Sequence, residues 1–202
     1  MLNLGIEANE KSVRAGRDTD ERALMTRVAA GDAPAFELLV ARHTAMVHAI
    51  AWRVLGDATE AEDVVQETFV KLWVNARGWT PAGGGLGGWL RRISTNACLD
   101  RLRRPRFVGD EGLPERADEA PPADVTLDAT RRGEAIAASI QALPDRHRAA
   151  IVLTYHEGVS NAEAAAILGI GVKALESLLV RARQALARSL ADRGLLDEGA
   201  RE

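Results

Sequence analysis

The chain has 202 residues, of which 47% are hydrophobic and 27% charged, and its formal net charge is −3. This length fits one large domain or two small ones, and the low aromatic content of 4% in a sequence rich in Ala, Leu, Arg and Glu favours helix over sheet. The acidic balance excludes the overall basic footprint typical of a stand-alone DNA-binding protein, so any DNA contact has to be local or assisted by a partner.

No stretch of the sequence predicts membrane insertion. The longest apolar run, from Ala45 to Leu55, is broken by His48 and Arg53 and is far shorter than the ~20 residues that a bilayer requires. The single cysteine, Cys98, has no partner for an internal disulfide, which is typical of a reducing compartment. We therefore expect a cytoplasmic protein with a disordered N-terminal arm over residues 1–19.

The first half of the chain predicts a domain of four helices over residues 20–106. Apolar spacing places the helices at about 20–30, 33–55, 59–76 and 86–104. Asp32 is the expected N-cap of the second helix, Gly56 its end, and Thr59 with Glu62 the capping box of the third. We expect the third helix to bury Val65, Phe69, Leu72, Trp73 and Ala76.

A flexible acidic linker is expected over residues 107–128. The stretch 108–135 holds three basic and eight acidic residues, with prolines at 114, 121 and 122 and few large apolar side chains. Such a composition buries too little surface to offset the entropy of ordering it. A second helical domain over 129–191 follows, with helices at about 129–142, 144–158, 160–169 and 172–190, and then a tail over 192–202.

The strongest local pattern lies between Val159 and Arg183. A capping box of Ser160 and Glu163 opens one helix, and the tight turn Gly169-Ile170-Gly171 leads into the next. This pattern predicts a helix-turn-helix whose second helix enters the major groove of DNA. The alternative is an ordinary pair of packed helices with no DNA contact.

Two charged faces are candidate binding surfaces in the first domain. Glu60, Asp63 and Glu67, with Gln66 beside them, form an acidic stripe that either is simply solvated or docks a basic partner. On the next helix, Arg92, Asn96 and Arg103 share a face with Trp89 at its edge, a set suited to single-stranded nucleic acid. The alternative for that set is a basic helix end favoured by the helix dipole, with Trp89 in the core.

No motif in the sequence predicts catalysis. The glycines between Gly83 and Gly88 lack the Lys-Ser/Thr of a phosphate-binding loop. The histidines, His43, His48, His147 and His156, do not lie at metal-ligand spacing with other ligands. We expect no enzymatic activity, no cofactor, no metal and no small-molecule substrate.

The order of these motifs resembles the extracytoplasmic-function (ECF) branch of the sigma-70 family of bacterial RNA polymerase sigma factors. The resemblance rests on the stretches 31–37, 61–69, 88–93, 100–104, 143–144, 167–170 and 181–183, with Asn96, Arg148, Ser160, Glu163 and Ala165. It implies an all-α fold of two small domains, called regions 2 and 4, joined by a linker. The implied function is promoter-specific initiation and promoter melting in response to stress or environment.

The resemblance also implies partners and contact residues. Asp63, Gln66 and Glu67, with Glu60 at the edge, would dock on the β′ clamp helices of core RNA polymerase, and region 4 would lie at the β flap. The −10 promoter element would meet Arg77, Gly78, Trp79, Thr80, Trp89, Arg92, Asn96 and Arg103. The −35 element would meet Ser160, Lys173, Glu176, Ser177, Arg181 and Arg183. An anti-sigma factor is the implied inhibitor.

One position departs from the pattern that the resemblance implies. Glu176 and Leu178 flank Ser177, where the family often has a basic residue and an arginine. Glu176 can accept a hydrogen bond from cytosine but repels phosphates. The rival interpretations are a stand-alone helix-turn-helix regulator and a module that only sequesters another factor.

Overall fold

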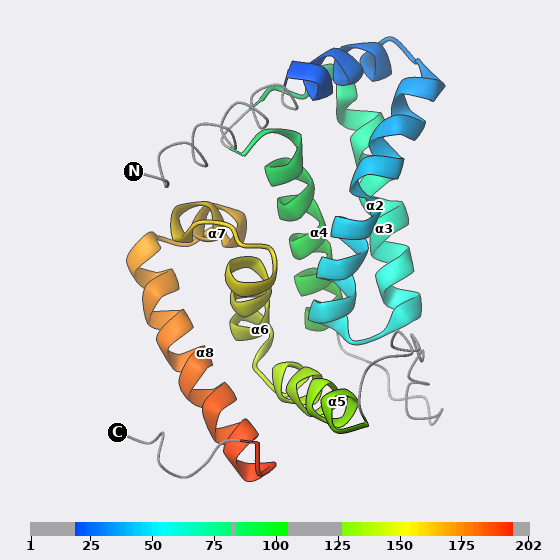
Figure 1. Cartoon of the computed structure of the whole chain (residues 1–202). Helices are drawn as coiled ribbons and strands as arrows, with labels where there is room; N and C mark the ends of the chain where they lie inside the picture. Colours follow the sequence, from blue (N-terminus) through cyan, green and yellow to red (C-terminus); the bar gives the residue numbers. More distant parts are fainter. Residues whose placement is uncertain (1–18, 82–83, 105–126, 196–202) are drawn as a thin grey trace, which may run out of the picture.

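The computed structural model describes residues 19–81, 84–104 and 127–195, the side chains of 127–131 excepted. In these ranges the chain is helical and contains no strand (Figure 1). The predicted N-terminal arm, acidic linker and C-terminal tail fall largely outside the described residues. The helices are residues 19–29, α2 (Ala33–Leu55), α3 (Ala58–Asn75), the 3-10 turn η1 (Ala76–Gly78), α4 (Gly85–Arg103), α5 (Leu127–Gln141), α6 (Asp145–Ile151), the π-helical turn η2 (Val152–His156), α7 (Asn161–Leu168) and α8 (Val172–Asp192).

Helix α2 begins and ends where the sequence predicts. Asp32 is its N-cap and accepts a hydrogen bond from the Ala35 amide at 3.0 Å. Gly56 ends it in the left-handed conformation, with φ of 71°, and its amide donates to the Trp52 carbonyl at 2.8 Å. Both caps satisfy backbone groups that have no partner inside the helix.

The predicted capping box of α3 is wrong. Asp57, not Thr59, is the N-cap, and its carboxylate accepts from the Glu60 amide at 2.8 Å. Asp57 follows Gly56 directly and is the last extended residue before the helix, so the helix starts two residues earlier and Thr59 lies inside it.

The buried face of α3 also differs from the prediction. The buried residues are Ala61, Val64, Thr68, Phe69 and Leu72, whereas Val65 is half-buried and Trp73 is 40% exposed. The ring of Trp73 meets that of Phe36 on α2 edge-on, with centroids 5.1 Å apart, at the border of the core. A large ring can therefore be partly buried without pointing at the bundle axis.

The second half forms the predicted helix-turn-helix. Ser160 caps α7 by accepting from the Glu163 amide at 3.2 Å, and Gly169 ends α7 with φ of 64°. The carboxylate of Glu163 does not complete the predicted capping box, because it lies beside Gly84 of the first half. Helix α6 passes into η2 without a break, so the predicted helix over 144–158 is confirmed with a π-helical last turn.

The two halves pack against each other on one side of α4 and at the end of α2, as Figure 1 shows. One hydrophobic cluster contains residues of both halves, among them Ile50, Val54 and Leu99 from the first and Val152 and Leu153 from the second. A second cluster belongs to the first half alone and holds Leu24, Met25, Leu39, Val47, Leu72 and Leu90. The chain is thus two helical units that share part of one core.

No helix within residues 19–81, 84–104 and 127–195 combines the length and the apolar character needed to span a membrane.

Cys98 is fully buried, and burial raises the pKa of its thiol to about 12. We predict that its reaction with iodoacetamide near neutral pH is at least ~100-fold slower in the native protein than in the urea-unfolded chain, because both access and thiolate are suppressed. Mass spectrometry of the alkylated fraction over time measures both rates. Similar rates in the two states would contradict the buried position.

Candidate functional site

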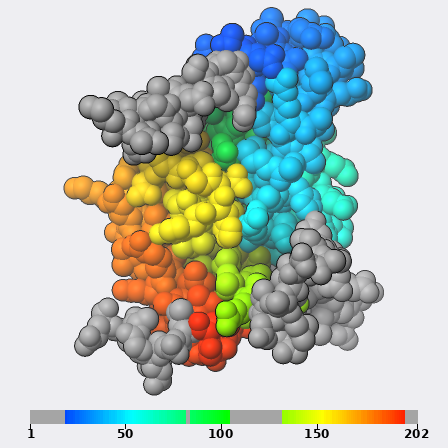
Figure 2. All heavy atoms as spheres, in the orientation of Figure 1, coloured from blue at the N-terminus to red at the C-terminus, as the bar shows by residue number. Residues whose placement is uncertain are grey.

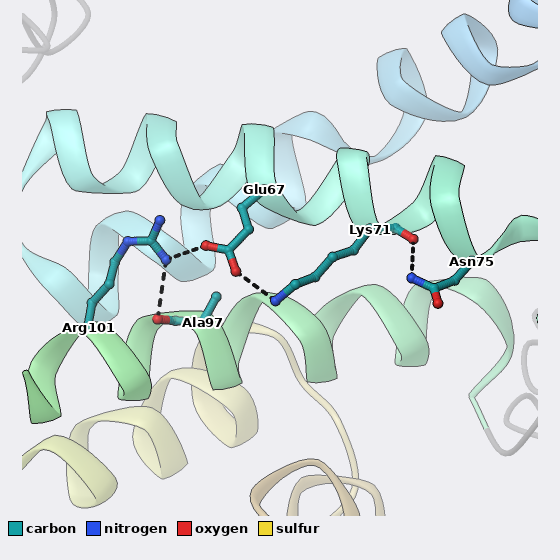
Figure 3. Close-up of polar contacts among 5 residues, drawn as sticks. All are labelled: Glu67, Lys71, Asn75, Ala97 and Arg101. Atoms are coloured by element: carbon teal, nitrogen blue, oxygen red, sulfur yellow. Dashed lines mark hydrogen bonds and ion pairs between the residues drawn. The ribbon is translucent and has the colours of Figure 1, made fainter.

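The predicted acidic stripe on α3 divides into an internal and an external part. Arg101 on α4 binds two of its carboxylates, with Nε 3.0 Å from Glu60 and Nη1 2.7 Å from Glu67. Figure 3 shows the contact with Glu67. The Arg101 side chain is only 17% exposed, so this bridge stabilises the contact between α3 and α4. Asp63 and Gln66 are exposed on the outer side of the helix.

Glu67 is held on both of its oxygens. Lys71 donates to Oε1 at 2.6 Å and Arg101 to Oε2 at 2.7 Å (Figure 3). The hydrogen bond from Lys71, followed by that from Arg101, lowers the pKa of Glu67 in spite of its partial burial. Glu67 is therefore ionised in the folded protein well below neutral pH.

Apolar side chains extend the external part of the stripe. Val70 and Val74 are 61% and 70% exposed, and Trp73 lies between them along α3. Their spacing from Asp63 and Gln66 places all five on one side of the helix. We call Asp63, Gln66, Val70, Trp73 and Val74 the α3 outer face. The sequence analysis missed its apolar members because it assigned Trp73 to the core.

Helix α4 presents a second exposed face. Arg92, Asn96 and Arg103 are exposed, as their spacing predicts, and Trp89 is half-buried at the edge. Asp100 shares the face and accepts from Arg103 at 3.2 Å. Because that ion pair is exposed and joins residues only three positions apart, it leaves the Arg103 guanidinium accessible to another anion.

The loop that precedes α4 is tied to the first helix of the chain. Arg77 Nε donates to the carbonyl of Ala29 at 3.2 Å, and Gly78 and Thr80 are exposed. Trp79 packs half-buried against the core of the first half. Its indole Nε1 is buried, and no described residue accepts a hydrogen bond from it.

A cavity of about 280 Å³ lies beside this loop. Trp79 and Arg22 contribute to its wall together with the first residues of α4, whose amides have no side-chain cap. The sequence analysis did not identify Arg22, because only the packing of residues 19–29 brings it here. The lining residues are Glu21, Arg22, Trp79, Pro81, Gly84, Gly85 and Leu86.

A basic stripe follows the exposed side of α8. Lys173, Ser177 and Arg181 lie on it one turn apart and are exposed, as predicted. Gln184 and Arg188, three and seven residues after Arg181, extend the same side of the helix and were not predicted. Lys173, Ser177, Arg181, Gln184 and Arg188 are called the α8 stripe below.

Three other predicted contact residues lie near the α8 stripe. Glu176 is exposed beside it, and Ser160 is exposed at the start of α7. Arg183 is also exposed, and its guanidinium donates to the Tyr155 hydroxyl at 3.2 Å. In the described ranges, no group of three or more His, Cys, Asp or Glu side chains has the arrangement of a metal site.

Two family models match the segments that carry these faces. Sigma-70 region 2 matches residues 39–107, which include the α3 outer face and the exposed face of α4. Sigma-70 region 4 matches residues 133–186, which include the helix-turn-helix. The ECF RNA polymerase sigma factor SigW of Bacillus subtilis is 32% identical over 178 residues, which are 82% of this chain and 94% of that protein.

The chain belongs to the ECF sigma factors of the sigma-70 family. Sigma factors are transcription-initiation factors and are not themselves enzymes. The ECF sigma factor SigE of Mycolicibacterium smegmatis is 36% identical over 162 residues, and the match spans 78% of this chain and 62% of SigE. The match to SigW extends over nearly the whole of that relative.

Two solved structures of sigma factors have the same fold. CnrH in complex with the cytosolic domain of CnrY has a TM-score of 0.62 and 34% identity, and covers 86% of this chain and 98% of its own. RpoE of Bartonella quintana in complex with the anti-sigma factor NepR has a TM-score of 0.63 and 28% identity, with coverage of 77% and 96%. The prediction of an all-α, two-unit sigma factor is confirmed.

The Arg101 bridge gives a prediction with a defined pH dependence. Because the pKa of Glu67 is lowered, its ion pairs stabilise the fold above the ordinary value of 4.5 and are lost as pH falls through the folded-state value. Because these carboxylates are only partly buried, Arg101→Gln should lower the free energy of unfolding by about 1 kcal/mol at neutral pH. The loss should be much smaller at a pH below the folded-state pKa of Glu67. Urea unfolding at the two pH values measures the difference. An equal loss at both would show that the bridge is not the cause.

Proposed function

We propose that this sigma factor binds core RNA polymerase through the α3 outer face. The supporting observation is the division of the stripe: Glu60 and Glu67 are held by Arg101, whereas Asp63 and Gln66 have no protein partner among the described residues. An exposed apolar patch beside charged groups is the usual composition of a protein-binding surface. Glu60 and Glu67 contribute at the border while they remain paired. The polymerase contact is the β′ clamp helices.

We propose further that the first half binds the −10 element as single-stranded DNA. Arg92, Asn96 and Arg103 lie on one exposed face, so their cations can follow phosphates while an amide meets a base. The cavity beside Trp79 has the size and lining for one unpaired base, with an aromatic ring, the Arg22 cation and the amides of α4 at its wall. Capture of that base offsets part of the cost of unstacking, so promoter melting needs no chemistry in this chain.

The second half is proposed to bind the −35 element as duplex, near the β flap. The α8 stripe has the geometry of a recognition helix, and Ser160 stands at the start of α7, where an amide and a hydroxyl face phosphates in such motifs. Glu176 beside the stripe lowers the affinity for phosphates and makes binding dependent on the polymerase.

This factor would act where the chromosome lies, in the cytoplasm. It would carry no enzymatic activity of its own.

An anti-sigma factor is the proposed regulator. The solved CnrH and RpoE structures each contain a bound partner, the cytosolic domain of CnrY and the anti-sigma factor NepR. Because this chain shares their fold over most of its length, we propose a partner of the same class. Responsiveness to stress or environment would come from release of that partner.

Run-off transcription with purified core polymerase tests the polymerase contact. We predict initiation that depends on this protein, from candidate promoters that include its own, and at least a tenfold loss on Asp63→Arg, because the reversed charge meets a basic surface. Glu134→Arg, the same change at an exposed site on α5, should leave initiation unchanged. Binding of a promoter fragment without polymerase, together with no effect of Asp63→Arg, would favour the stand-alone regulator.

The α8 stripe gives a separate prediction. Arg181→Ala should reduce initiation at promoters with a −35 element and lower the salt dependence of promoter binding by about one counterion, while polymerase binding stays unchanged. Arg193→Ala is the matched control, because Arg193 is exposed beyond the end of α8 and away from the stripe. Equal effects of the two substitutions would argue against a specific contact by Arg181.

A further inference from the structure

The two halves meet at the carboxyl end of α2, whose last carbonyls have no partners inside the helix. Gln141 Nε2 donates to the Arg53 carbonyl at 2.8 Å, and Arg148 Nη1 donates to the Val54 carbonyl at 2.7 Å. Both donors come from the second half. Arg148 is only 7% exposed, and its positive charge lies at the negative end of the α2 dipole.

The buried Arg148 and the half-buried Gln141 form one hydrogen-bonded unit. Arg148 also donates to Gln141 Oε1 at 2.7 Å, so the amide of Gln141 is fixed in the orientation that serves the Arg53 carbonyl. The close approach depends on Gly56, because a Cβ at that position would lie 2.8 Å from the Gln141 side chain. The end of α2 is therefore shaped to receive this pair.

A second contact between the halves lies where the amino end of α4 meets α7. Here the second half contributes a negative charge, whereas at α2 it contributes a positive one. The Glu163 carboxylate lies where α4 begins, with Oε1 2.8 Å from the position that a Cβ on Gly84 would take. Gly84 supplies no side-chain cap, and the Glu163 carboxylate, whose Oε1 is buried and accepts no hydrogen bond from a described residue, places a negative charge near the positive end of that helix. Arg91 on α4 and Glu157 form an ion pair between the halves at 3.4 Å, with side chains 21% and 10% exposed.

We propose that these contacts are a latch that holds the free sigma factor closed. The latch is the set Gln141 and Arg148 at the end of α2, with Glu157 and Glu163 at the start of α4. It adds two hydrogen bonds to the end of α2 and the ion pair of Arg91 with Glu157 to the shared hydrophobic cluster, and it consists of residues of this chain only. Closure therefore needs no bound partner, and an anti-sigma factor would act on a body that is already closed.

Closure opposes promoter binding in two ways, and this step rests on the proposed function. Gly84 lines the cavity assigned to the unpaired base, so the Glu163 carboxylate beside it repels the phosphates of an incoming strand. In addition, the −10 and −35 elements are about 25 base pairs apart, or ~85 Å of duplex. A compact body of this size is about 40 Å across. The two binding faces reach both elements only when the halves separate.

A charge swap across the latch tests the proposal on the full chain. Small-angle X-ray scattering should show a compact wild type and an increase in radius of gyration of about 3 Å or more for Glu157→Arg and for Arg91→Glu. The double variant restores the pair with reversed sign and should return to the wild-type radius. Glu134→Arg, the same charge change on the exposed side of α5, should stay compact.

Single variants that open should also initiate transcription at lower protein concentration, and the double variant should not. If a charge-reversed variant loses helix content by circular dichroism, Glu157→Gln and Gln141→Ala take its place. The latch is overturned if the wild-type protein is extended in solution. It is also overturned if the single variants are as compact as the wild type, even when the protein supports transcription. Expansion and rescue without any transcription leave the latch standing and count against the proposed function.

Discussion

The carboxyl end of α2 is the point on which the arrangement of the whole molecule depends. A helix end leaves carbonyl groups that cannot be buried without donors. Here Gly56 stops the helix, and Gln141 and Arg148 of the other half supply the donors. The shared hydrophobic cluster can therefore form around this end with the Arg53 and Val54 carbonyls satisfied, and the position of α5 and α6 against the first half follows from it.

A similar use of charge organises the surface of the first half. Arg101 pairs Glu60 and Glu67 toward α4, although their side chains stay 44% and 36% exposed. The α3 outer face then consists of one carboxylate, one amide and three apolar side chains, with the exposed Glu62 beside it. The same bridge thus stabilises the bundle and limits the surface open to a partner. Three acids that look equivalent in the sequence therefore differ in the structure, because two of them pair with Arg101 and one is available for binding.

Much of the secondary structure could be predicted because its signals are local. Asp32, Gly56, Ser160 and Gly169 act as caps through backbone groups within a few residues of themselves, and each was identified correctly. The error at Thr59 arose because two residues with capping ability lie close together, and only the backbone turn after Gly56 decides between them. The exposed faces of α4 and α8 were predictable for a related reason, since helical spacing alone determines which side chains share a side.

The candidate site was predictable only in part. Helical spacing placed Asp63, Arg92, Asn96, Lys173 and Arg181 on their helices, but it could not show that Trp73 points outward. It also could not find Arg22 beside Trp79, because the helix that carries it reaches the loop only in the folded bundle.

By itself, the sequence determined the helical fold, the order of the helices, most of their ends and the family, because each of these follows from local propensity, periodicity or motif. Only the tertiary structure decided that Arg101 divides the acidic stripe, that the end of α2 is completed by the other half, and that Arg91 of α4 pairs with Glu157. Those contacts join residues 34 to 94 positions apart. No local pattern encodes them, since they depend on how the units pack and on which polar groups each buried helix end leaves to be satisfied.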